Sequence, residues 1–322
     1  MAANRTAGVT IVTSTIRTKH MQDIFDNFER QLWPVKELIV IVNDNGIALR
    51  PYKELAARYG GVRVFRVDGS RNLGACLNYA VARARYPYVA KFDDDDYYAP
   101  RYLDEAMLLF AKKKADVVGK RSCYFFFPHR SLLLLRRTTV KPYGRCRRIA
   151  GATIMFRKRV FKKVAFSAKV AAGSDVRFVN ACLRNGYKVF TSSSYNFAAY
   201  RRPNRKSHTW QVSEQRLLAS KGAKIVRTAD FKPYVERSLD QLPLPEALRP
   251  DDAGQAGGAQ AWSGPAGAGL AYGGGARNGF ANGLPNGAGK SAAGGAGNGA
   301  GNDQAKGVLA PFGRALSMRR RP

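Results

Sequence analysis

Four consecutive aspartates, from Asp93 to Asp96, are the residues of this chain most suited to chemistry. Adjacent carboxylates repel one another, and a hard divalent cation such as Mg²⁺ or Mn²⁺ offsets that repulsion through the oxygen ligands that it prefers. The run is also compatible with a solvent-exposed acidic turn, or with a helix cap before Pro100. The position of the run in the fold therefore decides between a metal site and a turn.

Three other polar segments follow apolar runs as the aspartates do. The four polar segments are 13–17, 43–45, 70–72 and 93–96. In an open α/β sheet, ligands bind in the crevice beyond the carboxyl ends of the strands. We therefore expect the four segments to meet at one edge of a sheet, with side chains suited to hydrogen-bonding a nucleotide.

The elements that must position these segments alternate between strand and helix patterns. Strands are predicted at 9–13, 38–42, 62–65 and 88–92, with helices between them at 21–32, 52–59 and 73–85. Continuous apolar strands that alternate with helices are typical of a parallel sheet covered on both faces. The first half is thus predicted to be a Rossmann-like α/β unit that binds a nucleotide.

The pattern changes after residue 116, where short strands and a hairpin are predicted, followed by helices. These predictions cover strands within 117–156 and helices near 158–164, 175–185 and 211–221. Residues 241–322 hold 20 of the 32 glycines, and such a Gly/Ala/Asn-rich segment buries too little apolar surface to fold. We expect a domain over 1–240, with a nucleotide-binding half at about 8–116 and an acceptor half at about 117–240, and a disordered tail over 241–322.

The charge of the chain predicts an anionic partner or substrate. Lys and Arg number 54 against 23 Asp and Glu, which gives a formal net charge of +31. Residues 117–174 contain 15 Lys and Arg and no acid. This block suits an anionic membrane surface, an acidic or phosphate-rich acceptor or a nucleic acid, and a general compositional bias towards Arg and Ala would also produce it. Because no helix-turn-helix, zinc-finger or RNA-binding signature occurs, we expect no specific nucleic acid partner.

Several common classes of protein are excluded by motifs that the sequence lacks. It contains neither a Walker P-loop nor a G-x-G-x-x-G that opens a helix after a strand, which excludes the usual ATPases and dinucleotide enzymes. Enzymes in which a nucleotide's diphosphate is the leaving group remain. The four cysteines show no C-x-x-C or zinc spacing, and no apolar run is long enough to span a membrane, so we expect a cytoplasmic location.

Four motifs in order resemble those of the family 2 glycosyltransferases of GT-A fold, over about residues 8–110 and more weakly to about 211. These motifs are segments 9–13 and 37–44, Arg71-Asn72-Leu73-Gly74 with Asn78, and Phe92-Asp93-Asp94-Asp95-Asp96 with Pro100. The resemblance implies a nucleoside-diphosphate-sugar donor with a preference for UDP, a divalent metal (Mn²⁺ or Mg²⁺), and inversion at the anomeric carbon. The implied acceptor is a surface or envelope glycan or a lipid-linked glycan.

The resemblance also assigns roles in binding the donor. Asp44 is expected to contact the base, with Thr13 and Thr15 lining the same pocket. The other residues expected to bind the nucleotide sugar are Arg17, Arg71, Asn72, Asp93, Arg201 and Arg202. The last two form a basic pair in a late loop, and such pairs are also often merely solvated.

The D-x-D motif of the family falls on Asp93 and Asp95. Asp95 is the expected metal ligand, Asp93 is expected to bind the ribose or the metal, and Asp96 matches a further aspartate often found there. Asp94 occupies the variable position of the motif and is expected to be a spectator. His208, in the late loop, is a further metal candidate, or else a surface residue that caps the last helix.

Asp175 is the candidate for the base that inverting transfer requires. It lies at the start of a helix in the second half, where the family places a carboxylate, and it is the first acid after Asp116. The alternative is an ordinary helix cap or first-turn acid, which Asp favours for backbone reasons.

Two other functions stay open. One is a non-catalytic module that binds polyanions through a degenerate GT-A fold, and the other is a nucleotidyltransferase, which also uses carboxylate-held metal. Four adjacent carboxylates in so basic a chain favour the enzyme over the binding module. The basic surface further predicts peripheral contact with the inner face of an anionic membrane.

Overall fold

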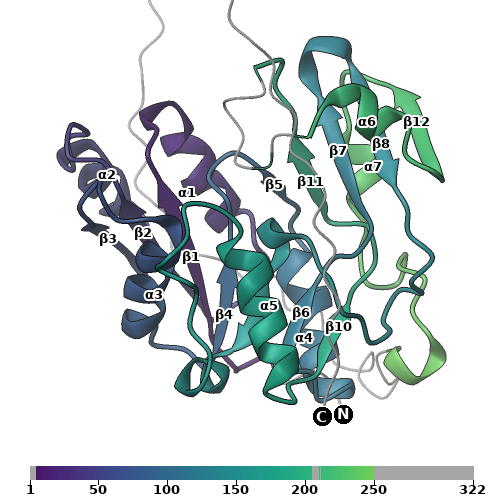
Figure 1. Cartoon of the computed structure of the whole chain (residues 1–322), viewed down its shortest axis with the longest axis horizontal. Coiled ribbons are helices and arrows are strands. Elements are labelled where there is room, and N and C mark those ends of the chain that lie inside the picture. Colours follow the sequence, from purple (N-terminus) through teal and green to yellow (C-terminus); the bar gives the residue numbers. More distant parts are fainter. Residues whose placement is uncertain (1–4, 205–209, 211, 250–322) are drawn as a thin grey trace, which may run out of the picture. The chain divides into compact units, whose positions relative to one another are not determined.

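The computed structural model describes residues 5–204, 210 and 212–249, and they form two β-sheets with helices packed against them (Figure 1). The larger sheet has the strand order β10-β6-β9-β4-β1-β2-β3. Its strands are β1 (Val9–Thr15), β2 (Lys36–Val42), β3 (Val62–Arg66), β4 (Tyr88–Lys91), β6 (Val117–Gly119), β9 (Met155–Arg157) and β10 (Val189–Thr191). The strands β3, β2, β1 and β4 pair in parallel, whereas β9 is antiparallel to both β4 and β6.

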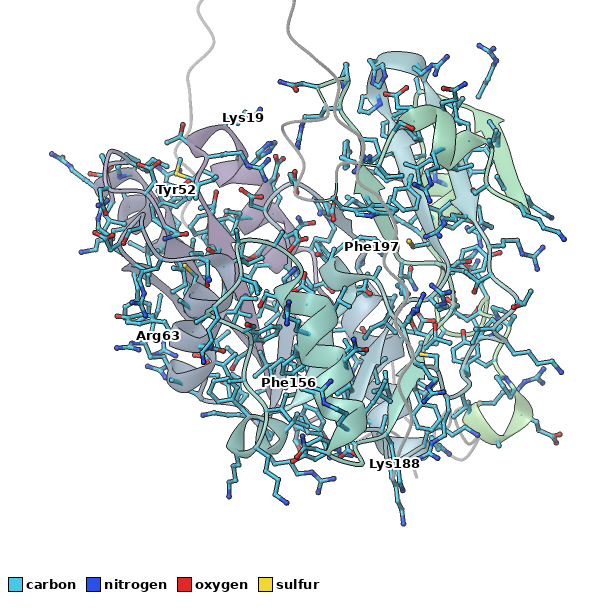
Figure 2. All side chains as sticks on the ribbon, in the orientation of Figure 1. Lys19, Tyr52, Arg63, Phe156, Lys188 and Phe197 are labelled. Atoms are coloured by element: carbon cyan, nitrogen blue, oxygen red, sulfur yellow. The ribbon has the colours of Figure 1, made fainter. Side chains whose placement is uncertain are left out.

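Successive strand residues face opposite sides of the larger sheet, and each side has its own helices. The α-helices in the described ranges are α1 (Met21–Glu29), α2 (Arg50–Ala56), α3 (Leu73–Arg83), α4 (Tyr102–Lys112), α5 (Ser174–Arg184), α6 (Glu214–Leu218) and α7 (Lys232–Val235). Ile11 and Val40 belong to the core that contains residues of α1, α2 and α4. Val12 and Ile39 belong to the core beneath α3 and α5, together with Phe156, which Figure 2 labels.

The aspartate run leads directly into the first strand of the smaller sheet. Its strand order is β12-β8-β7-β11-β5. These strands are β5 (Tyr97–Tyr98), β7 (Cys123–Phe127), β8 (Leu132–Arg136), β11 (Phe197–Tyr200) and β12 (Ala223–Arg227). Because β4 ends at Lys91 in the larger sheet and β5 begins at Tyr97 in the smaller one, the four aspartates form the connection between the two sheets.

The predicted fold class is confirmed, since a largely parallel α/β sheet leads into a mixed second half. All four strands predicted in the first half are present, and so is the hairpin, formed by β7 and β8. The helix predicted over 158–164 is instead a short 3-10 segment, Lys158–Lys162. The helix predicted over 211–221 is limited to Glu214–Leu218, because Ser213 caps its start.

The predicted start of the tail, residue 241, is too early. Leu242, Leu244 and Leu248 are buried in the core that also contains α4, so the packed chain continues to at least residue 248. Leucines at these spacings supply apolar area that the overall Gly-rich composition conceals. The remainder of the predicted disordered tail, 250–322, lies outside the described residues. No helix within the described ranges has the length and apolar character needed to cross a bilayer.

Candidate active site

The parallel pairing of β1 with β2 and β4 brings the carboxyl ends of these strands to one edge of the larger sheet. Thr15 is in register with Val42, and the backbone N–H of Asn43 donates to the carbonyl of Thr15 (2.8 Å). The polar segments that follow the strands therefore lie side by side, as the sequence predicts.

Arg17, which follows β1, is held by the second aspartate of the run. Nε of Arg17 donates to Oδ2 of Asp94 (3.2 Å), and the hydroxyl of Thr15 donates to the same oxygen (2.6 Å). The phenol of Tyr52, labelled in Figure 2, donates to the backbone carbonyl of Arg17 (3.1 Å). Because a buried carboxylate must be paired, Asp94 helps to fix the geometry of the site. The expectation that it is a spectator in metal and donor binding stays a prediction.

Asp95 contacts arginines from two distant parts of the chain. Its Oδ2 lies 3.1 Å from Nη2 of Arg17 and 2.8 Å from Nη1 of Arg202, which follows β11. These positive charges lower the pKa of Asp95 below its ordinary value, although burial acts in the opposite direction. Arg17 and Arg202, both predicted to bind the nucleotide sugar, thus meet at the second aspartate of the D-x-D motif, and their role in donor binding stays a prediction.

Arg201, the other member of the basic pair, contacts the late loop. It is buried and donates to the backbone carbonyls of Trp210 (3.2 Å) and Val212 (2.8 Å). These bonds tie the end of β11 to the start of the segment that precedes α6. His208, the loop candidate for the metal, lies outside the described residues.

Lys91, the last residue of β4, joins the first aspartate of the run to Asp175. The Lys91 side chain is 1 % exposed, and its Nζ lies 2.5 Å from Oδ1 of Asp93 and 3.3 Å from Oδ2 of Asp175. The same ammonium donates to the backbone carbonyl of Gly151 (3.2 Å). Burial lowers the pKa of Lys91, but the two carboxylates outweigh it and raise that pKa overall. Partial burial and the charges of Asp175 and Asp95 raise the pKa of Asp93, despite its contact with Lys91.

Asp175 occupies the first turn of α5 and not its cap position. The helix starts after Gly173, whose φ of +79° favours glycine. Oδ2 of Asp175 faces Lys91, while Oδ1 is buried and has no hydrogen-bond partner among the residues that the structure describes. A Cβ at position 151 would lie 2.4 Å from Oδ2, so the glycine there leaves room for the carboxylate. Asp175 is thus not the helix cap but is a first-turn acid, which the alternative interpretation also included. Its role as a base stays a prediction.

Asp96 and Asp44 make local contacts. Oδ1 of Asp96 accepts from the backbone N–H of Tyr200 (3.0 Å) and so fixes β11. Burial and the neighbouring Asp95 and Asp93 raise the pKa of Asp96 well above its ordinary value. Asp44 lies just after β2 and is partly exposed, with Oδ1 accepting from the N–H of Gly46 (2.7 Å).

The remaining residues predicted to bind the nucleotide sugar lie near this edge of the sheet. In the described part of the chain they form no hydrogen bond or ion pair with the four aspartates. Asn72 caps α3 by accepting from the N–H of Ala75 (3.0 Å), and its amide donates to the carbonyl of Val170 (3.0 Å). Arg71 is exposed, and Thr13 is buried within β1. Their roles in donor binding stay predictions.

The carboxylate oxygens of Asp93 and Asp95 fit a hard divalent cation in their chemistry. Within the described ranges, no group of three or more His, Cys, Asp and Glu is placed to hold a metal ion. Mg²⁺ is commonly bound through one or two carboxylates together with substrate phosphates and water. The donor set therefore fits a cation that is shared with a diphosphate.

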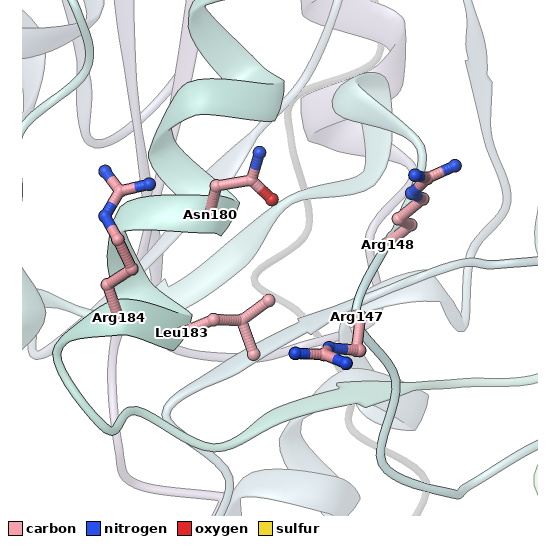
Figure 3. A pocket seen from close by; sticks show the side chains of 5 residues that line it. All are labelled: Arg147, Arg148, Asn180, Leu183 and Arg184. Carbon is pink, nitrogen blue, oxygen red and sulfur yellow. The ribbon is translucent and has the colours of Figure 1, made fainter. Parts of the chain in front are cut away.

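Two open cavities lie along α5. One of about 370 Å³ is lined by Arg147, Arg148, Asn180, Leu183 and Arg184 (Figure 3). The other, of about 700 Å³, shares Asn180 and Arg184 and extends to Gly173 beside Asp175. We call the four arginines of the two cavities the cationic face: Arg147, Arg148, Arg177 and Arg184. None of them forms an ion pair with a carboxylate in the part of the chain that the structure describes.

Two residues that contribute to this geometry were not predicted from the sequence. Lys91 was visible as the one charged residue of an apolar strand that runs directly into the aspartates. Gly151 gave no signal, because its contact with Asp175 depends on a fold that brings together distant segments.

Comparison of the sequence with known proteins finds glycosyltransferases. Residues 11–165 match the model for the family described as glycosyl transferase family 2. An uncharacterized glycosyltransferase of Methanocaldococcus jannaschii is 25% identical over 167 residues, which cover 49% of this chain and 57% of that protein. This chain thus spans little more than half the length of that relative.

Solved structures with a similar fold include two complexes with a sugar nucleotide. Residues 1–349 of S. aureus TarS, in complex with UDP-GlcNAc, share 16% identity with a TM-score of 0.48, covering 62% of this chain and 59% of that one. The mannosyltransferase PcManGT of Pyrobaculum calidifontis, in complex with GDP-Man and Mn²⁺, shares 18% identity with a TM-score of 0.46, covering 60% and 56%.

Proposed function

Because residues 11–165 match the model for glycosyl transferase family 2, we propose that this chain transfers a sugar from a nucleoside-diphosphate donor, in particular a UDP-sugar, to an acceptor hydroxyl with inversion. The proposed acceptor is a surface or envelope glycan or a lipid-linked glycan. The supporting observation is that Lys91 contacts both Asp93, on the donor side, and Asp175, in the acceptor half. A carboxylate able to act as a base thus lies beside the aspartates that follow β4.

Asp175 is the proposed general base. Its carboxylate takes the proton of the acceptor hydroxyl while the acceptor oxygen forms a bond to the anomeric carbon. The bond from that carbon to the diphosphate breaks, and the diphosphate leaves with the electron pair. Attack on the face opposite the leaving group inverts the anomeric configuration.

Positive charge at the strand ends suits the departing diphosphate. Arg17 and Arg202 meet at Asp95, and their guanidinium groups can donate charge-assisted hydrogen bonds to phosphate oxygens. A Mn²⁺ or Mg²⁺ ion held by Asp93 and Asp95 would add positive charge at the same place. In the absence of ligand, the arginines balance the charge of Asp95.

The cationic face supports an acceptor that carries negative charge. It lies along α5, whose first turn contains Asp175, so an acceptor bound there would extend from the base over unpaired arginines. The proposal includes a cytoplasmic location with peripheral contact to the inner face of an anionic membrane, where each cation contributes about 1 kcal/mol.

A thermal-shift screen of the full chain with UDP, GDP and dTDP, each with Mn²⁺ and with chelator, tests donor binding. A ligand at about 100 times its Kd stabilises a protein by about 2.7 kcal/mol, which such a screen resolves. The nucleotide that binds then selects the nucleotide sugar for a transfer assay with an envelope-glycan fraction. Retention on a polyanion matrix without nucleotide binding would favour the non-catalytic module. Release of pyrophosphate from a nucleoside triphosphate and a sugar phosphate would favour the nucleotidyltransferase.

A further inference from the structure

Lys91 is an unusual residue for its position. It lies at the end of a strand in the middle of the larger sheet, with neighbours Ala90 and Phe92 buried, and its own side chain is 1 % exposed. Desolvating an ammonium group is unfavourable unless carboxylates and hydrogen-bond acceptors surround it. An apolar side chain would fill the same space without that cost, so the charge of Lys91 calls for a role beyond packing.

The partners of Lys91 come from both halves of the predicted domain. Asp93 belongs to the connection between the two sheets, whereas Asp175 belongs to α5 and Gly151 to the 3-10 segment Gly151–Thr153. One buried ammonium therefore binds the first aspartate of the D-x-D motif and the candidate base together. These contacts fix the distance between donor-side and acceptor-side carboxylates.

The contacts also fix the orientation of the Asp175 carboxylate. Oδ2 lies 3.3 Å from Nζ of Lys91, and Gly151 packs against the same oxygen. Oδ1 is left buried without a hydrogen-bond partner among the described residues. An unsatisfied buried carboxylate oxygen is unfavourable unless a ligand donates a hydrogen bond to it. The Asp175 side chain is nevertheless 21 % exposed, so an acceptor can approach a carboxylate that is already held in place.

We propose that Lys91 is a positioning residue for sugar transfer, which holds the Asp175 carboxylate in one orientation and keeps it at a fixed distance from Asp93. This inference rests on the proposed function. Lys91 itself exchanges no proton with the substrate and forms no bond to it. Its effect on the reaction is exerted through Asp175.

The test compares Lys91→Met with Lys120→Met in the full chain. Lys120 is a matched control, because it is also almost fully buried and also pairs with a carboxylate, at 2.9 Å from Oε2 of Glu105. We expect both variants to lower the melting temperature. Of the two variants, only Lys91→Met should lower the kcat for transfer at saturating donor. The expected decrease is about 10²-fold, the effect of a misplaced catalytic group.

A second comparison separates positioning from a general structural effect. If Lys91 acts through Asp175, adding Lys91→Met to Asp175→Asn should leave kcat within about threefold of Asp175→Asn alone, because residues that act as a unit are non-additive. A crystal structure of Lys91→Met should show the Asp175 carboxylate rotated away from Gly151. Should Lys91→Met not fold, Lys91→Gln is the replacement in each comparison.

Two outcomes would overturn the inference while the proposed function stands. One is a parent that transfers sugar and a Lys91→Met variant whose kcat stays within about threefold of it. The other is a double variant that is much slower than Asp175→Asn. If the parent transfers no sugar at all, the proposed function fails, and an unmoved Asp175 in the crystal structure of Lys91→Met would then reject the positioning role independently.

Discussion

Nη1 of Arg202 lies 2.8 Å from Oδ2 of Asp95, an ion pair that joins the end of β11 to the connection between the two sheets. Arg17 contacts the same oxygen from the end of β1. Three segments far apart in the sequence thus converge on one carboxylate. A diphosphate that approached Asp95 would meet two guanidinium groups already held in place.

We expect the affinity for a nucleoside diphosphate to depend on both the metal and Arg202. Chelator should weaken UDP binding to the parent, and Asp95→Asn should remove the difference between Mn²⁺ and chelator. Arg202→Met should weaken binding by about tenfold to a hundredfold, since a hydrogen bond to a charged group contributes about 1.5–3 kcal/mol. Calorimetric titration measures both effects. Equal affinity with and without chelator would contradict the metal assignment.

Asp96 predicts an unusual pH dependence of stability. Burial and the neighbouring aspartates raise its pKa well above the ordinary 3.8. At pH values between 3.8 and the raised pKa, the folded state therefore binds more protons than the unfolded state. Stability should therefore fall as the pH rises through that interval. Asp96→Asn, which can still accept from the N–H of Tyr200, should reduce this fall. Urea unfolding at several pH values, in chelator, measures it, and an equally steep profile in the variant would contradict the prediction.

The end of the packed chain can be located by two truncations. Removal of 241–322 deletes Leu242, Leu244 and Leu248, each of which contributes on the order of 1.5–3 kcal/mol when buried. We expect that truncation to lower the melting temperature by roughly 10 °C. Removal of 250–322 keeps all three leucines and is the matched control. Equal melting temperatures for both truncations would show that these leucines do not stabilise the domain.

The first half of the fold was predictable because its strands are short, mostly apolar runs followed by polar residues. Helix α4 was not, because from Tyr102 to Phe110 each of its side chains is buried, and a helix that is buried all round shows no amphipathic period. The segment 158–164 has helix-forming residues, but the structure forms only the 3-10 segment Lys158–Lys162 directly after β9.

In the site, the residue types were predictable and their partners were not. The sequence indicated Asp93, Asp95 and Asp175 as site residues. That the ammonium group of Lys91 lies between Asp93 and Asp175 became visible only in the structure. A lysine in a strand looks like an edge or surface residue until its burial is known. Asp94 was set aside because a family pattern leaves its position variable, whereas its contact with Arg17 is a property of this chain.

Asp175→Asn tests the assignment of the base. The amide keeps the shape of the carboxylate but cannot accept a proton, so transfer with saturating donor should fall by about 10²-fold to 10⁴-fold while UDP affinity persists. Hydrolysis of the donor by water, measured in parallel, needs no positioned base and serves as the control. Transfer within about threefold of the parent would end the assignment.

The cationic face predicts how strongly binding of the acceptor depends on salt. Replacing Arg147, Arg148 and Arg184 by alanine should raise the KM for an anionic acceptor glycan by about tenfold at low salt, with kcat unchanged, because exposed charges attract without entering the chemistry. The matched control replaces three other exposed cations, Arg58, Arg216 and Lys224, which removes the same charge elsewhere. We expect the difference between the two triple variants to shrink as salt rises, since screening at 0.15 M acts over about 8 Å.

Equal KM values for both variants would show that only net charge matters. A lost affinity for anionic vesicles, with an unchanged KM, would assign the cationic face to the membrane.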